Sequence, residues 1–352
     1  MASLTPRIDR LQKNYLINGD MRIAQRGTSF AAIANTAYSL DRWRYAKSGA
    51  MVHTVTQDTD VPTLAQAGYL FQNSYRANLT TPDTSIAAGD YCLIQQFVEG
   101  YNWAHLAQKP VTLSFWVKAT LAGTYCVSIR SSGTDRSFVA QYTIDTTNTW
   151  ERKVIQIEAS PSSGTWNYTN GIGANISWAV AVGSTYHTTA GSWQSGDFFG
   201  TSSQVNGTNT GATDFRLTGI MLSEGHLTDP EFSTFGKDFQ AETKACQRYY
   251  EKSYDLTTNP GTVTAAGGWL FSGPVSAPRR ISTPMKVRKR VAPAVVFYST
   301  ATGATGVVNR DSSGDTAINI NVSGETHIGY EVSSFPAGEV RSYVQWTADS
   351  EL

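Results

Sequence analysis

The chain has 352 residues, enough for one large or two ordinary domains with buried cores. Aromatic residues make up 11% of it and charged residues only 16%, and its formal net charge is zero. This balance provides no overall field to attract DNA or RNA, which argues against a nucleic-acid partner, and it is typical of β-sheets with polar outer faces.

Residues 1–13 are polar, and they predict either an attachment arm to a larger assembly or a frayed end. They lack the apolar core of a secretory signal, and no run of about eighteen apolar residues follows, so we expect no membrane insertion. Next, two short apolar runs flank Asn18, Gly19 and Asp20, a signal for a hairpin or a corner. We assign residues 1–35 to an N-terminal attachment arm and first hairpin.

The clearest strand lies at residues 111–118. Apolar residues alternate there with polar ones, so the apolar set should face a core and Thr112 and Lys118 should be exposed. Trp116 falls on the polar side, where it either faces a partner or lies under a loop. The residues expected in the core are Val111, Leu113, Phe115 and Val117.

Other short strands are expected on both sides of this one, separated by turns rich in Gly, Ser, Thr and Asn. This pattern predicts an all-β fold, a β-sandwich that is most simply a jelly roll, over residues 36–235. Gly219 interrupts the last of these strands and predicts a bulge. The expected strands are 91–98, 125–130, 138–144, 150–158, 177–182 and 215–222.

Between residues 160 and 213, aromatic side chains alternate with Gly, Ser, Thr and Asn. We interpret this stretch as long loops on the sandwich, where recognition is usually placed. Aromatic rings can stack on the C–H face of a sugar while amides and carboxylates bind its hydroxyls. The alternative is that the rings anchor the loops to the sandwich. The candidate glycan-binding residues are Trp166, Tyr168, Tyr186, Trp193 and Asp197.

After Asp238, a capping residue, the spacing of Phe239, Thr243, Cys246 and Tyr250 predicts one short helix. It lies in a linker, residues 236–254, between the jelly roll and a smaller β domain over residues 255–352. Strands are expected there at 268–273, 294–299, 317–322, 327–332 and 341–347. The candidate subunit or domain interface residues are Phe239, Cys246, Tyr249, Tyr250 and Tyr254.

Several motifs carry a resemblance to known proteins. The run CQRYYEKSY begins at Cys246, and a strand ending in Leu222, Glu224 and Gly225 precedes it. Nearer the start lie Asn14–Met21, Gln25–Gly27 and Leu40–Trp43. In this order, the motifs resemble bacteriophage virion proteins of the tail-fibre or receptor-binding type. In that family a carbohydrate-binding-module-like jelly roll precedes a "C-x-RYY" helix and a C-terminal β domain.

The resemblance implies a protein of the virion, made in the host cytoplasm and exposed on the outside of the particle. Its partners would be other virion proteins, further copies of itself in a homotrimer, and a host surface polysaccharide or lipopolysaccharide. No cofactor is expected. A Ca²⁺ ion often braces jelly rolls of this type, and Asp20, Asp41 and Asp214 are the oxygen donors that would suit it, although the sequence does not bring them together.

Other clusters favour plainer interpretations. The acids Asp197, Asp214, Glu224 and Glu231 contain no spacing that predicts a glycosidase pair, so we expect no enzyme. The three cysteines are far apart, and buried free thiols are favoured over a Cys92–Cys126 disulfide. A basic cluster either binds phosphate or acidic sugars or forms a solvated edge, the second being favoured. Its members are Arg279, Arg280, Lys286, Arg288, Lys289 and Arg290.

Three hypotheses follow. The first is a tail-fibre or receptor-binding component whose jelly roll contacts host glycans. The second is a virion structural protein without a glycan role, such as a head-decoration fibre, an adaptor or a spacer. The third, which the absence of an enzyme motif disfavours, is a tailspike that degrades polysaccharide.

Overall fold

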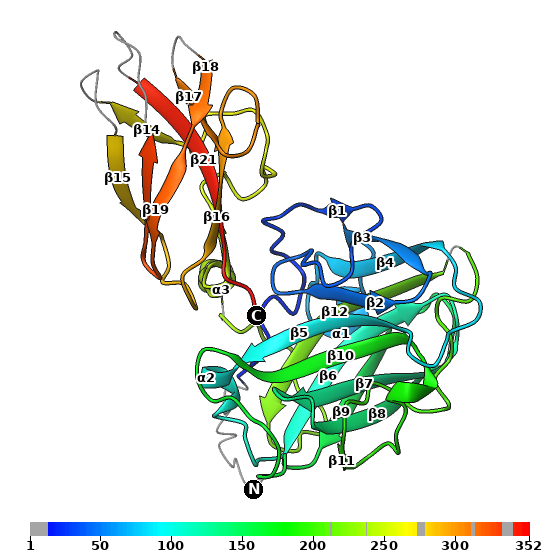
Figure 1. Ribbon diagram of the computed structural model, residues 1–352. Coiled ribbons are helices and arrows are strands. Elements are labelled where there is room, and N and C mark those ends of the chain that lie inside the picture. Colours follow the sequence, from blue (N-terminus) through cyan, green and yellow to red (C-terminus); the bar gives the residue numbers. More distant parts are fainter. Residues whose placement is uncertain (1–12, 212, 237, 273–278, 311–313, 333–340) are drawn as a thin grey trace, which may run out of the picture.

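The computed structural model describes residues 13–211, 213–236, 238–272, 279–310, 314–332 and 341–352. They form two β-rich domains, with helix α3 at the boundary between them (Figure 1). The all-β fold expected from the sequence is confirmed, because the described helices are short and the sheets are antiparallel. None of these helices is long and apolar enough to cross a membrane.

The larger domain is a sandwich of two six-stranded sheets, which we call sheet A and sheet B. In spatial order, sheet A consists of β1 (Ser29–Phe30), β3 (Val52–Asp58), β4 (Ser74–Thr81), β12 (Asp214–Glu224), β6 (Val111–Ala119) and β9 (Glu151–Ile157). Sheet B consists of β11 (Trp193–Ser195), β8 (Arg136–Ile144), β7 (Gly123–Ser131), β10 (Ile172–Val182), β5 (Tyr91–Glu99) and β2 (Arg44–Ser48). Short helices α1 (Leu64–Ala67) and α2 (Gly100–Trp103) and a 3₁₀ turn (Ser184–Tyr186) connect them.

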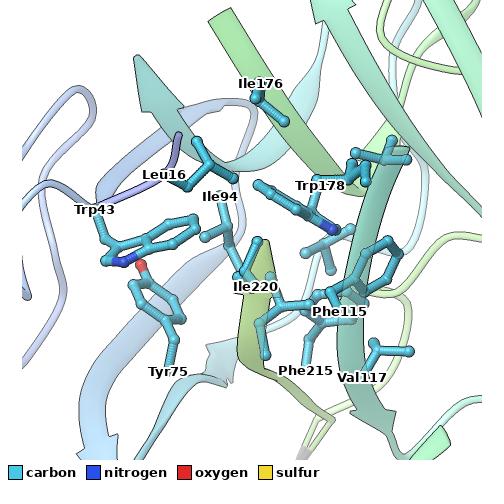
Figure 2. Close-up of a cluster of buried hydrophobic side chains, with 14 of the residues drawn as sticks. Leu16, Trp43, Tyr75, Ile94, Phe115, Val117, Ile176, Trp178, Phe215 and Ile220 are labelled. Atoms are coloured by element: carbon cyan, nitrogen blue, oxygen red, sulfur yellow. The ribbon is translucent and has the colours of Figure 1, made fainter. Parts of the chain in front are cut away.

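The core of the sandwich lies between the two sheets (Figure 2). Trp178 on β10 meets Phe115 on β6 edge to face, with ring centroids 5.6 Å apart, and Trp43 packs on its other side, also at 5.6 Å. Such aromatic pairs add to the burial of apolar area that stabilises the sandwich. The four apolar residues of the 111–117 alternation are buried as predicted.

The outer face of sheet A differs from the prediction, because distant segments cover it. Thr112 is buried, since its hydroxyl donates to the Gly225 carbonyl at 2.7 Å and accepts from the Leu227 N–H at 2.8 Å. Trp116 lies under a loop, packed with Phe71 and Trp150. Lys118 is only half-buried and pairs with Asp60 at 2.6 Å.

Gly219 produces the predicted bulge in β12. Its φ is +58°, in the left-handed region that favours glycine, and the register with β6 shifts between Thr218 and Met221. A Cβ at this position would lie 2.6 Å from the ring of Phe71, so a larger residue would displace the cover of sheet A.

The described part of residues 1–35 packs against the sandwich instead of extending from it. Leu16 and Met21 are fully buried in its core. The turn at Asn18 is a corner, since residues 13–28 contain no strand. The Asn18 side chain donates to the carbonyls of Ile23 and Asp41 and accepts from the Ile23 N–H. These hydrogen bonds hold the chain in the corner. Residues 1–12, the predicted arm, lie outside the described residues.

Strand β21 (Arg341–Asp349) organises the smaller domain, because β13, β14, β16 and β17 all pair with it. A three-stranded sheet packs beside it over a core that includes Phe297, Tyr330 and Trp346. The other strands are β13 (Tyr250–Lys252), β14 (Trp269–Ser272), β15 (Arg279–Pro284), β16 (Ala294–Ser299), β17 (Val307–Arg310), β18 (Gly314–Ala317), β19 (Asn319–Ser323) and β20 (His327–Val332). Gly273, the end of one predicted strand, lies outside the described residues.

Helix α3 (Phe239–Gln247) begins as predicted, with the Asp238 carboxylate accepting from the Ala241 N–H at 2.8 Å. The helix ends before Tyr250, which belongs to β13. The prediction that Tyr250 lies on one helix face with Phe239 and Cys246 is therefore wrong. The buried side chains of the helix are Glu242 and Cys246, whereas Phe239 is 43% exposed. All three cysteines are buried and free, as favoured from the sequence.

Candidate functional site

The outer face of sheet B carries an open hollow of about 290 Å³. Strands β2, β5, β7 and β10 form its floor, and its walls include Ser132, Thr134, Tyr186, Asp197 and Phe199. Because side chains alternate along a strand, the residues on this floor are those that point away from the core. The lining residues considered below are Arg44, Tyr91, Gln95, Phe97, Arg130, Asn175, Tyr186, Asp197 and Phe199.

A row of polar side chains crosses the floor. Arg44 on β2 lies opposite Gln95 on β5, which lies opposite Ser177 on β10. The side-chain amide of Gln95 donates to the Ser177 hydroxyl at 3.0 Å, and this hydroxyl donates to the side-chain oxygen Oδ1 of Asn175 at 3.0 Å. The Asn175 amide nitrogen has no acceptor among the described residues, so it is available to a hydroxyl group of a bound molecule.

Aromatic rings form one wall of the hollow. Tyr186 stacks on Phe199 with ring centroids 4.5 Å apart, and Tyr91 meets both rings edge to face at 5.4 and 5.3 Å. Phe199 is buried, whereas Tyr91 and Tyr186 are half-buried. These two tyrosines line the hollow and are packed but still partly exposed, so they offer both apolar ring surface and polar hydroxyl groups, which suits an amphipathic ligand such as a sugar.

Arg130 connects the aromatic wall to the floor. Its guanidinium carbon lies 4.2 Å from the centroid of the Phe199 ring, and the group forms an ion pair with Asp197. Burial lowers the pKa of Arg130, the Asp197 carboxylate partly opposes this, and the like charge of Arg44 lowers the pKa further. The two arginines are thus close enough to repel each other across the hollow.

The structure divides the predicted glycan-binding residues into two groups. Tyr186 and Asp197 line the hollow. Trp166 and Trp193 lie outside it, with centroids 5.7 Å apart and packed against the sandwich core. Their indole N–H groups donate to the Ser163 and Glu158 carbonyls at 3.1 and 3.0 Å, the arrangement of rings that anchor loops. Tyr168 is 41% exposed and also lies outside the hollow.

No protein-family model matches the chain, and no curated protein matches it in sequence. Solved structures resemble a part of it. The enzymatically active domain of tailspike protein 4 from bacteriophage CBA120 is 16% identical over 55% of this chain, with a TM-score of 0.32. This chain spans only 21% of the length of that domain.

Two smaller structures align over most of their own length. One is described as CBM4, is 13% identical, and aligns over 59% of this chain and 98% of its own, with a TM-score of 0.31. The other is TmCBM61 in complex with β-1,4-galactotriose, 10% identical over 60% of this chain and 99% of its own, with a TM-score of 0.30. The likeness is limited to part of the fold.

The floor of the hollow is not among the candidate sites expected from the sequence. The sequence predicts the strand at 91–98, but it singles out no binding residue on that strand. A signal was present, because Tyr91, Leu93 and Phe97 are as apolar as Cys92 and Ile94 between them. A strand that is apolar on both faces is covered on both, and here the segment 186–199 covers the second face.

The acids considered for catalysis and for metal binding lie apart. Asp214 and Glu224 lie at opposite ends of β12, roughly 30 Å apart for an eleven-residue strand. A glycosidase pair needs a separation of about 5–9.5 Å. Asp214 pairs with Arg76 at 3.0 Å, Asp41 accepts from Gln25, and Asp20 pairs with Arg22. No group of three or more potential metal ligands was found among the described residues.

Part of the motifs that carry the family resemblance, around Arg26, Arg42 and Tyr249, meets elsewhere, at a buried boundary that we call the domain joint. Arg42 pairs there with Glu351, and its guanidinium carbon lies 3.5 Å from the centroid of the Tyr249 ring. Arg26 pairs with Asp349 at 2.9 Å and lies over the Tyr250 ring at 3.7 Å. The joint therefore connects the N-terminal motifs, the CQRYY run and the last residues of the smaller domain.

The predicted interface residues lie in and beside the joint. Tyr249 is buried, and its hydroxyl donates to the Glu99 carboxylate of β5 at 2.5 Å. Cys246 is buried with Tyr249 in a small apolar cluster. Tyr254 lies deeper in the smaller domain, where its hydroxyl accepts from the Gly261 N–H at 3.0 Å. Phe239 is the exposed exception.

Two members of the basic cluster belong to the joint as well, so its interpretation as a solvated edge is wrong for them. Lys289 is completely buried and pairs with Glu251 at 2.5 Å. Arg290 donates to the carbonyls of Asn170, Ser350 and Glu351 at 2.7–2.9 Å. Arg280 and Arg288 remain exposed, paired with Glu331 and Glu325.

Proposed function

We propose that the protein is a structural component of a tailed-phage virion, of the tail-fibre or receptor-binding type, and that it binds a host surface glycan in the hollow of sheet B. The hollow carries this proposal. Rings on one wall can stack on the C–H face of a sugar, while the Asn175 amide and the guanidinium groups bind hydroxyls. At about 290 Å³, it is at the small end of ligand pockets, and it suits a short part of a glycan.

A glycan array probed with the full chain, together with host polysaccharide and lipopolysaccharide, tests the binding. Asn175→Ala should weaken the binding of any glycan that the array identifies. Asn209→Ala is the matched control, because Asn209 is exposed and does not line the hollow. Equal binding by both variants would remove the hollow from the proposal, and a silent array would remove the glycan role.

The location and assembly belong to the same proposal. We expect the protein on the exterior of the particle, in contact with other virion proteins and assembled as a homotrimer. Several weak sites acting together would raise avidity without new contacts. Electron microscopy of antibody-labelled virions tests the location. Light scattering of the purified chain at micromolar concentration tests the trimer, which a monomeric mass would contradict.

The alternative is a virion structural protein without a glycan role, such as an adaptor or a spacer. One observation favours it: several residues of the resemblance motifs, namely Arg26, Arg42 and Tyr249, lie in the domain joint and do not line the hollow. The glycan array separates the two functions, since an adaptor would bind none of its members.

Catalysis is not part of the proposal. The wide separation of Asp214 and Glu224 and the pairing of Asp197 with Arg130 support binding without hydrolysis. Incubation with the polysaccharide that is bound most tightly, followed by a reducing-sugar assay, tests this. Release of reducing ends at a rate above that of a boiled sample would favour the tailspike hypothesis.

A further inference from the structure

The hollow of sheet B contains an excess of positive charge. Its described lining holds two guanidinium groups, from Arg44 and Arg130, and a single carboxylate, from Asp197. Asp197 is engaged with Arg130. Arg44 has no carboxylate within ion-pair distance in the described part of the chain, and its partners are the neutral oxygens of Thr36 and Gln95.

The hydrogen bonds of Arg44 are long, 3.4 Å to the Thr36 carbonyl and 3.5 Å to the Gln95 side chain. Good N–H···O bonds lie at about 2.7–3.2 Å, so most of the donor capacity of this guanidinium is unused. The group is nevertheless positioned, because its carbon lies 5.2 Å from the centroid of the buried Phe97 ring. Arg44 is thus a charge held over the floor of the hollow and available to a ligand.

Arg130 adds a second set of unused donors. It is 4% exposed, it lines the hollow, and its Nε has no hydrogen-bond partner among the described residues. A buried donor without a partner is unfavourable, and so is the repulsion between Arg130 and Arg44. An anion between the two guanidinium groups would relieve the repulsion.

We propose that the hollow binds an acidic saccharide, whose carboxylate or sulfate or phosphate ester lies between Arg44 and Arg130. The Asn175 amide and the faces of Tyr91 and Tyr186 bind the rest of the sugar. Guanidinium groups suit this role, because their fork of N–H donors matches carboxylate and phosphate oxygens. The inference rests on the proposed glycan binding and adds the charge class of the glycan.

Pairs of polymers that differ only in their acidic group provide the test. Oligogalacturonate is compared with its carboxyl-reduced form, and dextran sulfate with dextran, so that carboxylate and ester groups are assayed separately. We expect the acidic member of at least one pair to bind the full chain tenfold or more tightly than its neutral counterpart. Added salt should reduce this preference, because salt screens charge–charge attraction.

Variants assign the preference to the hollow. Arg44→Met keeps an unbranched side chain over Phe97 and removes the charge, and it should abolish the preference for the acidic member. Arg44→Lys should retain part of it. Arg280→Met is the matched control, since Arg280 is an exposed arginine of the smaller domain, and it should leave the preference intact. Circular dichroism confirms that each variant is folded.

Four outcomes would overturn the inference. Equal binding of the acidic and the neutral member in both pairs would show that the protein does not distinguish glycans by their charge. A preference that survives in Arg44→Met would place the acidic group elsewhere. If only neutral glycans bind and Asn175→Ala weakens them, the acidic ligand is wrong while the proposed function stands. Binding of no glycan at all overturns both.

Discussion

The domain joint and the hollow of sheet B contain the same kinds of side chain, and they differ in how these are paired. Arg42 and Arg44 show the difference most directly, because they flank Trp43, whose ring is buried in the sandwich core. Arg42 points into the joint, where it pairs with Glu351 and donates to the Phe97 carbonyl at 2.6 Å. Arg44 lines the hollow, where no carboxylate of the described residues lies within ion-pair distance of it.

The comparison shows that arginines and aromatic rings do not by themselves indicate a binding site. In the joint they are buried and matched by carboxylates of the same chain, so their charges hold the two domains together. In the hollow the Arg44 guanidinium has only long hydrogen bonds to neutral oxygens and no carboxylate partner among the described residues, so a ligand can pair with it. Pairing and access, rather than residue type, distinguish the two regions.

The largest expected effect is the loss of a buried charge pair in the joint. Arg42→Met would leave the Glu351 carboxylate, whose side chain is 5% exposed, without its main partner. We expect unfolding free energy to fall by about 3–5 kcal/mol, the usual cost of breaking a buried pair. Denaturant unfolding of the full chain measures this, and Arg288→Met, which removes an exposed pair, should cost at most about 1 kcal/mol. A loss below 1 kcal/mol in Arg42→Met would contradict the role of the joint.

The joint should also respond to pH through Glu242 of α3. Burial raises the pKa of Glu242 from 4.5 to about 7, although the Asn18 and Gly236 N–H groups lower it by donating to the carboxylate. The folded chain therefore keeps a proton that the unfolded chain releases. Stability should be greatest below pH 4.5 for this group and decline as the pH rises to 7, by up to about 3 kcal/mol.

Denaturant unfolding at several pH values between 4.5 and 7.5 measures this decline. Glu242→Gln should remove the slope that Glu242 contributes, because an amide does not titrate. The variant should also be less stable throughout, since its amide nitrogen cannot accept one of the two backbone N–H groups. A variant with the same pH slope as the parent chain would assign the dependence to other groups.

Trp193→Ala tests whether the rings outside the hollow are architecture. Trp193 packs against Phe138 with centroids 5.7 Å apart and donates to the Glu158 carbonyl. We expect a loss of about 2–3 kcal/mol, less than for a fully buried tryptophan, with a lower melting temperature. Adsorption to host cells should be unchanged below the new melting temperature. An adsorption defect without a change in melting temperature would indicate that Trp193 binds the glycan, as the sequence predicts.

Tyr186→Ala tests the aromatic wall of the hollow. Removing one stacking ring should weaken glycan binding by about 1–3 kcal/mol, or roughly fivefold to 150-fold in affinity, by analogy with base stacking. Isothermal titration with a glycan selected on the array measures it. Tyr168→Ala removes an exposed ring outside the hollow and should bind as the parent chain does. If Tyr168→Ala weakened binding more than Tyr186→Ala, the site would have to be moved.

The smallest expected effect on stability is that of Arg44→Met. Because Arg44 forms no ion pair with the described residues and its hydrogen bonds are long, unfolding free energy should change by no more than about 0.5 kcal/mol. Parallel melting curves of Arg44→Met and Arg42→Met check this. Similar losses in both variants would remove the distinction between the hollow and the joint.

The sequence was sufficient to predict the strand at Val111–Val117 and the bulge at Gly219, because the period of two and the glycine are local features. It did not predict β3 and β4, and the strand expected at 317–322 is divided between β18 and β19. It was not sufficient for Thr112 and Trp116, whose burial depends on distant cover from residues such as Phe71 and Gly225. The hollow was missed for the same reason. Its floor comes from strands that become neighbours only through the sheet order β7-β10-β5-β2, which no local pattern encodes.

For the aromatic rings between residues 160 and 213, the sequence does not show which rings line the hollow. Polar neighbours make Trp193 and Tyr186 equivalent in the sequence, yet one anchors a loop and the other lines the hollow. Only the path of the loops decides between them. The C-x-RYY motif was placed on a helix, whereas Arg248–Tyr250 follow α3 and lead into β13.

The joint also has a mechanical consequence. The smaller domain is attached to the sandwich at several points, among them the place where the chain enters it, at Arg248, paired with Glu99 at 2.5 Å, and the place where β21 leaves it towards Glu351. Tyr38 adds a further contact, donating to the Leu352 carbonyl at 2.6 Å. A body fastened at several points resists swivelling. We therefore expect a torque on the smaller domain to be transmitted through β21 and the Arg42–Glu351 pair to the sandwich, so that the two domains rotate together.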